Sequence, residues 1–229
     1  MCLSACIKEH IEIPASINVV NVAINAGIVK VNYFGKSINW GSYTGTEASV
    51  VYGANKVYSV VDARSEFSLN IVRSTDTTKS VFNGHLNLTA GSINSLYLTG
   101  QSPNYDTVFV KESAFPVYAD SAFAVRFINL VPNSGDVNVT LASSSTVNEF
   151  TGLAYKKQSV FKKYEATYKF PNTYFNFQVR NSNGILLASH TISSANHMAT
   201  RRKRATLVFR GLIGGTGTNS PAISFVPNY

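Results

Sequence analysis

Cysteine is scarce in this chain, and what there is lies at one end. Cys2 and Cys6, the only two, fall among the first six of 229 residues. The rest of the sequence therefore has no thiol for a disulfide framework, a thiolate metal site or a cysteine nucleophile. The four histidines are scattered and do not have metal-ligand spacing such as H-E-x-x-H. We expect no metal and no other cofactor.

Long apolar runs and helical periodicity are also missing. No stretch approaches the roughly 20 apolar residues that a membrane-spanning helix needs. Short runs with alternating apolar and polar residues recur instead, bounded by Gly, Asn, Ser and Pro. Clear examples are 29–33, 67–71, 96–98, 125–127, 137–139, 175–179 and 223–225. Such runs, at intervals of about 8–12 residues, predict an all-β chain of sandwich or barrel type.

The two halves of the chain resemble each other. Three motifs occur in the same order in each half: Asn18–Val22 with Val125–Asn129, Leu69–Ser74 with Phe177–Ser182, and Leu96–Gly100 with Leu207–Gly211. Duplication explains this shared order better than a common β composition does. We therefore predict an all-β fold of two tandem immunoglobulin-like antiparallel β-sandwich domains.

The segment before the first domain has a motif of its own. Leu3-Ser4-Ala5-Cys6 resembles the lipobox that precedes the lipid-modified cysteine of bacterial lipoproteins. The resemblance implies lipid attachment at Cys6, which would tether the protein to a membrane. Only five residues precede Cys6, without a basic or an apolar signal region, so we expect a longer signal peptide upstream of Met1. The alternative is a chance match, with two inert thiols at the terminus.

Three segments follow from these patterns. Residues 1–16 are predicted to be a truncated signal, lipobox and tether, 17–113 the first β-sandwich domain, and 121–229 the second. The seam is expected within Glu112 to Ala122, where Pro116 and small residues interrupt the strand pattern.

Acidic residues are scarce in the second half. Residues 1–115 contain eight basic and eight acidic residues, whereas 116–229 contain twelve basic and four acidic ones, so the net charge of +8 lies entirely in the second half. Most of the excess forms two clusters: Lys156, Lys157, Lys162, Lys163 and Lys169, then Arg201, Arg202, Lys203 and Arg204.

Clustered basic residues attract polyanions over about a Debye length, roughly 8 Å at physiological salt. The clusters predict a surface for acidic polysaccharide, lipopolysaccharide phosphates or anionic lipid. An equally weighted alternative is a solvated hairpin tip whose charge serves solubility. Nucleic acid is the weakest candidate partner, because no recognisable nucleic-acid fold signature accompanies the basic residues.

Patterns that would indicate catalysis are absent. No G-x-S-x-G elbow holds a serine nucleophile, and the four acidic residues of the second half form no close pair suited to glycoside hydrolysis. The glycine-rich stretch 211–218 lacks the G-K-[ST] of a phosphate loop. Trp40 and Tyr43 could form a sugar-stacking platform, although packing against the first sandwich is the favoured interpretation of a single tryptophan.

A further resemblance lies in the second half. Val125-Arg126-Phe127-Ile128-Asn129-Leu130-Val131-Pro132-Asn133, followed by Val137-Asn138-Val139, is similar to the opening of domain-of-unknown-function family number 4397. An R-x-x-N-x-x-P strand and turn precedes a V-D-V type strand in that family, and a later strand ends in glycine. The resemblance implies β-sandwich repeats, often in tandem, in bacterial lipoproteins and secreted proteins, including those of Bacteroidetes. It brings no catalytic residues.

Together these observations suggest a non-enzymatic, lipid-anchored protein of the bacterial cell envelope, on the periplasmic or outer face of the outer membrane. The basic second domain would bind an anionic partner, and the neutral first domain would act as a spacer. Two alternatives stay open. One is a structural or assembly accessory of a pilus-like surface complex, and the other is a glycan-active enzyme.

Overall fold

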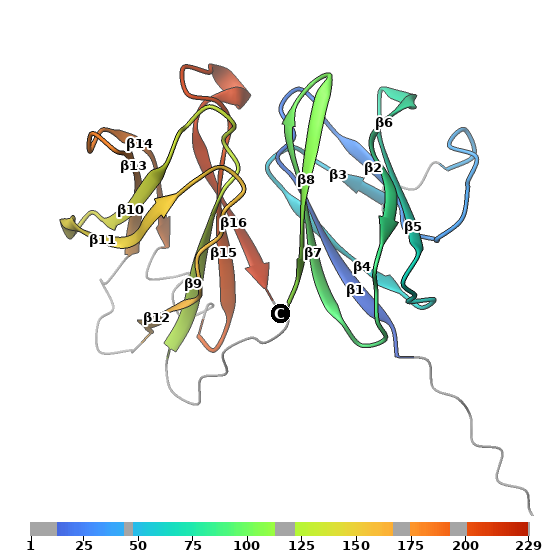
Figure 1. The fold of residues 1–229 in the computed structure, drawn as a ribbon, viewed down its shortest axis with the longest axis horizontal. Helices are drawn as coiled ribbons and strands as arrows, with labels where there is room; N and C mark the ends of the chain where they lie inside the picture. Colours follow the sequence, from blue (N-terminus) through green and yellow to red (C-terminus); the bar gives the residue numbers. More distant parts are fainter. Residues whose placement is uncertain (1–12, 44–47, 113–121, 167–174, 193–200, 229) are drawn as a thin grey trace, which may run out of the picture.

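The computed structural model describes residues 13–43, 48–112, 122–166, 175–192 and 201–228. The described residues form sixteen β-strands in four four-stranded sheets, with one short 3-10 turn at Gly217–Asn219 (Figure 1). The all-β prediction is confirmed. No helix in these segments has the length and hydropathy needed to span a bilayer. The predicted lipid attachment residue, Cys6, and the basic residue Lys169 lie outside the described residues.

The first sandwich contains strands β1 to β8. Its inner sheet, which faces the second sandwich, has the strand order β4-β1-β7-β8, and its outer sheet has the order β3-β2-β5-β6. The strands are β1 (Ala15–Asn21), β2 (Val29–Asn32), β3 (Ser49–Val50), β4 (Asn55–Val60), β5 (Phe67–Arg73), β6 (Asp76–Leu86), β7 (Ile93–Gln101) and β8 (Asn104–Lys111). Ala15 and Ser16 were predicted to belong to the tether, but they begin β1, where Ala15 is buried and pairs with Val60.

The second sandwich repeats this arrangement with strands β9 to β16. Its inner sheet has the order β12-β9-β15-β16, and its outer sheet has the order β11-β10-β13-β14. The strands are β9 (Ala122–Asn129), β10 (Val137–Leu141), β11 (Ser144–Leu153), β12 (Lys162–Glu165), β13 (Phe175–Asn181), β14 (Leu186–Ile192), β15 (Arg204–Arg210) and β16 (Ala222–Asn228).

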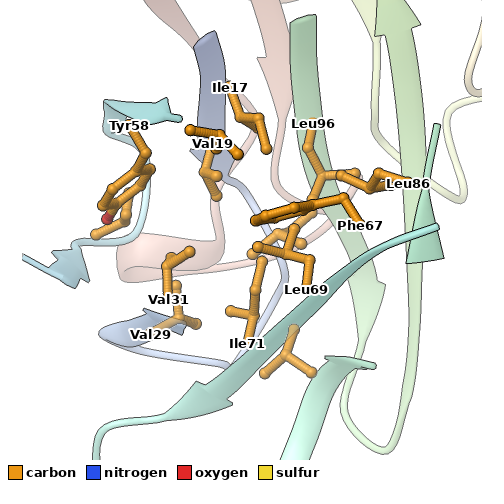
Figure 2. Close-up of a cluster of buried hydrophobic side chains, with 14 of the residues drawn as sticks. Ile17, Val19, Val29, Val31, Tyr58, Phe67, Leu69, Ile71, Leu86 and Leu96 are labelled. Carbon is orange, nitrogen blue, oxygen red and sulfur yellow. The ribbon is translucent and has the colours of Figure 1, made fainter. Parts of the chain in front are cut away.

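Alternating apolar residues fill the space between the two sheets of each sandwich. In the first sandwich, Val31 and Leu69 of the outer sheet meet Val19 and Leu96 of the inner sheet, and all four are fully buried (Figure 2). Full burial of one such side chain contributes about 1.5–3 kcal/mol. The period-2 runs therefore predicted the strands and their core faces correctly.

Each inner sheet contains one parallel pair, which the prediction of antiparallel sandwiches did not include. β1 runs parallel to β7, and β9 runs parallel to β15, while every other named pair is antiparallel. Parallel neighbours need a crossover connection. The outer-sheet strands provide this crossover, because they lie between the two partners in sequence.

Two buried asparagines correct the repeat alignment by one residue. Asn21 ends β1 and donates to the carbonyls of Gly27 and Val50, and Asn129 ends β9 and donates to those of Gly135 and Leu153. The matching contacts make Asn21 equivalent to Asn129. The sequence motif Asn18–Val22 had placed Val22 opposite Asn129 instead, because a run of valines does not fix the register.

An apolar interface joins the two sandwiches through their inner sheets. Its buried side chains come from both halves: Val20, Val22, Tyr97, Ile128, Leu130, Val208 and Val226. The Thr99 hydroxyl donates across this interface to the Leu130 carbonyl at 3.0 Å. Domains move independently unless their interface is large and hydrophobic. The continuous apolar contact indicates that these two sandwiches pack as one unit.

Candidate binding surfaces

Most of the predicted basic residues meet at one end of the inner sheet of the second sandwich. Lys163 on β12 and Arg204 on β15 both lie opposite Ala124 in register, so their side chains emerge on the same face. The turn before β15 joins them, because the Arg202 amide donates to the Ala122 carbonyl at 2.6 Å. We call Lys162, Lys163, Arg201, Arg202, Lys203 and Arg204 the basic end.

Lys156 and Lys157 do not belong to the basic end. Their backbones pair with Asn129 at the opposite end of β9, five residues from Ala124. At about 3.3 Å per residue this separation is roughly 17 Å, about two Debye lengths. The Lys156 ammonium also forms an ion pair with Asp106 of the first sandwich. The structure thus divides the eight clustered basic residues that it describes, Lys169 lying outside them, into six and two.

Cationic groups outnumber carboxylates at the basic end among the described residues. Lys162 lies 2.6 Å from Glu149 on β11, whose second contact is the Tyr164 hydroxyl at 2.8 Å. Glu165 is the one carboxylate on β12. Lys163, Arg202 and Lys203 are exposed to solvent. Among the described residues the basic end therefore combines six cationic groups with two carboxylates.

Next to the basic end lies a buried ion pair that the sequence analysis missed. Arg126 on β9 donates to both oxygens of Glu112, at 2.8 and 2.5 Å, and both side chains are about 5% exposed. Arg126 also donates to Thr206 and lies 4.8 Å from the ring centre of Phe161. Burial by itself lowers the pKa of Arg126, but its contacts with Glu112 and Tyr97 together more than offset this, so the pKa lies above its ordinary value.

This ion pair gives Glu112, the first residue of the predicted seam, a structural role. Glu112 was expected to open a linker, and residues 113–121 lie outside the described part of the chain. Glu112 itself follows β8 and bridges the two sandwiches, held also by the Ser95 hydroxyl at 2.9 Å. The signal in the sequence was Arg126 itself, a charge within the apolar run of β9.

The first strand starts at the same end of the molecule as the basic end. Ser16 pairs with Ile93 at the start of β7, and two residues along β7, Ser95 contacts Glu112 beside Arg126. The ribbon agrees, because β12 and the beginning of β1 both lie at the lower edge of the view (Figure 1).

Trp40 is not part of the buried core of the first sandwich. It lies in the loop after β2 and meets Tyr43 edge to face, with ring centres 6.0 Å apart. Trp40 also lines an open groove on the outer sheet of the first sandwich and stays partly exposed. The interpretation favoured from the sequence was packing against the sandwich, but Trp40 is not part of the core cluster of the first sandwich, and its described contacts are with Tyr43 and the groove.

The described carboxylates give little support to an enzyme. Five of them form ion pairs with basic side chains: Asp62, Asp76, Asp106, Glu112 and Glu149. Hydrolysis of a glycoside needs two carboxylates that face a common substrate. Within the described residues no group of three or more His, Cys, Asp or Glu side chains has metal-site geometry.

Each outer sheet has one short or irregular edge and one longer edge. β3 has only two residues, and β11 pairs with β10 through repeated register shifts, whereas the opposite edges are β6 with eleven residues and β14 with seven. Short or bulged edges disfavour the addition of another strand, so β6 and β14 are the outer-sheet edges at which the donor strand of a pilus-like complex would be tested.

Comparisons with known proteins give no family for the chain. No protein-family model and no curated protein matches it. A solved structure on alpha-glucan recognition by family 41 carbohydrate-binding modules from streptococcal virulence factors aligns over 91% of this chain and 96% of that chain, with 10% identity and a TM-score of 0.28. A second, on alpha-glucan binding by a streptococcal virulence factor, aligns over 85% and 93%, with 13% identity and a TM-score of 0.26. At these TM-scores the likeness carries no argument about function.

Proposed function

We propose that this chain is a non-enzymatic binding protein of the bacterial cell envelope, held at a membrane through Cys6, whose basic end engages a polyanion. The observation that carries the proposal is the register of the inner sheet in the second sandwich. It aligns Lys163 with Arg204 and brings the turn 201–203 beside them. Clustering matters because the potentials of neighbouring cations add within a Debye length.

The ligand class follows from the distribution of groups at the basic end. The cations are spread over β12, the turn before β15 and the first residue of β15, so they form a broad surface. A repeating polyanion can contact several of these groups at once. Acidic polysaccharide and the phosphates of lipopolysaccharide both have this form.

The polyanion part of the proposal is tested by removing two positive charges either from the basic end or from the opposite end of β9, and by comparing the binding of the two variants. The double variant Lys163→Gln/Lys203→Gln removes two exposed cations from the basic end, and Lys156→Gln/Lys157→Gln removes two from the opposite end of β9. Binding to lipopolysaccharide and to polygalacturonate is measured by calorimetry at several salt concentrations. At ~1 kcal/mol per cation beside an anionic surface, the first variant should bind about 30-fold more weakly.

The control variant should bind within about threefold of the wild type. Equal losses in the two double variants would show a diffuse charge effect and contradict the proposed surface. Salt-insensitive absence of binding to both polyanions would remove the polyanion part altogether. The anchor is tested separately, by globomycin-sensitive labelling of the full-length protein with a fatty-acid analogue and by its loss in Cys6→Ser.

A further inference from the structure

The outer sheet of the first sandwich carries a row of three asparagines. Asn32 on β2 lies opposite Asn70 on β5, which lies opposite Asn83 on β6. Directly opposed residues project from the same face of a sheet. The neighbouring residues Val31 and Ile71 point into the core, so the asparagine row faces outward.

The loop after β2 turns this row into a groove. The groove has a volume of about 270 Å³. Most of its lining residues have amide, hydroxyl or aromatic side chains, and the full lining is Asn32, Lys36, Ser37, Ile38, Trp40, Ser68, Asn70, Val72, Thr77, Ser80 and Asn83. We call it the asparagine groove. Lys36 is the one charged side chain among these lining residues.

The groove is held in shape from below and from the side. Asn32 is 5% exposed, donates to the Lys36 carbonyl at 2.8 Å and accepts from the Phe34 amide at 3.2 Å, so it fixes the start of the loop. On the other side of the loop, Lys30 donates to the Tyr43 carbonyl at 3.4 Å, and Tyr43 meets Trp40. The aromatic wall is therefore supported by the sheet beneath it.

One polar atom at the base of the groove has no partner. The Asn70 amide nitrogen donates to the Ser80 hydroxyl at 3.1 Å, while its Oδ1 is buried and accepts no hydrogen bond in the described structure. A buried acceptor without a partner costs about 1–3 kcal/mol. A ligand hydroxyl that reaches this oxygen would recover part of that free energy.

The equivalent face of the second sandwich lacks the asparagine row and the aromatic loop, although it has an unpartnered buried amide oxygen of its own at Asn176. The residues in matching register are Thr140, Gln178 and Ser189. β10 and β11 are joined by only two residues, whereas residues 33–48 separate β2 from β3. The two sandwiches share a fold, but only the first has the asparagine row and the aromatic loop. The groove is therefore a local addition to the repeat, because the fold does not require it.

We propose that the asparagine groove binds an uncharged sugar. The Asn70 oxygen supplies an acceptor and the exposed Asn83 amide supplies a donor and an acceptor, which matches the paired hydroxyls of a pyranose, while Asn32 holds the loop in place. An aromatic ring at the wall supplies a flat apolar surface for the C–H face of the sugar. Small-molecule sites combine apolar walls with a few fixed polar groups in this way. The first sandwich then has a binding role of its own, separate from the polyanion surface proposed for the second.

The single tryptophan makes the test direct. Because Trp40 is the one tryptophan in the chain, intrinsic emission reports on the groove alone. The full chain is titrated with maltotetraose, cellotetraose, xylotetraose and mannotetraose. At least one should shift the emission saturably, and this response should be independent of salt because no ion pair forms.

Two variants locate the response. Asn83→Ala removes an exposed amide from the groove, and Asn183→Ala removes an exposed amide from a turn of the second sandwich. Asn83→Ala should weaken the response about tenfold, and Asn183→Ala should leave it unchanged. Asn83 is on the solvent side of an edge strand, so its loss should not disturb folding. Circular dichroism checks this point.

Three results would overturn the proposal. Emission that stays flat with all four tetrasaccharides is the first. The second is a response that Asn83→Ala and Asn183→Ala leave equally intact. The third is a salt-sensitive response to polygalacturonate that Asn83→Ala removes, because the groove would then be an anion site. None of these depends on the basic end, so the two proposals fail independently.

Discussion

The buried ion pair between Arg126 and Glu112 gives the sharpest prediction about stability. Arg126→Met leaves the Glu112 carboxylate buried without its cation, and Glu112→Gln leaves the Arg126 guanidinium without its anion. Breaking a buried pair by removing one partner costs about 3–5 kcal/mol. For a chain of this size that corresponds to a fall in Tm of roughly 6–20 °C.

The double variant distinguishes the interaction energy of the pair from the cost of leaving one charge buried alone. Arg126→Met/Glu112→Gln removes both charges, so neither is left uncompensated. We expect it to be about 2–3 kcal/mol more stable than the sum of the single variants implies. Lys79→Met is the control, because Lys79 and Asp76 form a surface pair with a largely exposed lysine, and its loss should cost less than about 1 kcal/mol.

Urea denaturation with two probes measures these effects. Trp40 emission follows the first sandwich, and far-ultraviolet circular dichroism follows both. Because the pair bridges the sandwiches, its loss should also separate the unfolding transition of the first sandwich from that of the second. Single variants that cost less than about 1 kcal/mol, or a double variant equal to the sum of the singles, would refute the reasoning.

Three further predictions concern the scaffold. Asn129→Ala should lower the unfolding free energy by about 1–3 kcal/mol in the same urea assay, because the buried Leu153 carbonyl loses its donor. Gly211→Ala should lower Tm by calorimetry, because Gly211 has φ +98° and a Cβ there would collide with the Ser220 carbonyl; an unchanged Tm would contradict this. Burial lowers the pKa of His190 below 6.5, so protonation favours the unfolded state. Stability should be full above pH 6.5 and fall as the pH drops below it, and His190→Gln should reduce that fall in urea titrations between pH 7.5 and 5.

The strands were predictable because alternation records a single buried face. Leu69 and Ile71 point into the core, as their spacing indicated, and Gly100 is the next-to-last residue of β7, as Gly211 follows β15. Gly100 has φ +76°, and an added Cβ would lie 2.6 Å from the Asn104 carbonyl, which explains why glycine stands near the end of this strand. These features are local, so they can be read from a short stretch of sequence.

The interface between the sandwiches was harder to predict. β9 is buried along its whole length, because Phe127 faces the core of its own sandwich and Ile128 faces the other sandwich. A strand buried on both faces has a continuous apolar run. The sequence around Arg126 has this character, but a partner such as Glu112 is identified only when the two inner sheets are placed together.

The candidate surfaces depend on the register of strand pairing, which could not be predicted from the sequence. Lys163 and Arg204 are 41 positions apart in sequence and share a row only because both pair opposite Ala124. The asparagine groove has the same origin, because Asn70 and Asn83 become neighbours through the bulged pairing of β5 with β6. The composition of the second half identified its excess of positive charge, whereas the strand register determines which of the basic side chains lie side by side.

The central claim is that the two sandwiches present two chemically different glycan surfaces. Amide chemical-shift mapping on the ¹⁵N-labelled chain tests it most directly, with polygalacturonate and the neutral tetrasaccharides added separately. The account predicts that the polyanion shifts amides around Ala124 and Lys163, while a neutral sugar shifts Asn83 and the single Trp40 indole resonance. Shifts from both ligands on the same residues, or shifts confined to Lys156 and Lys157, would contradict it.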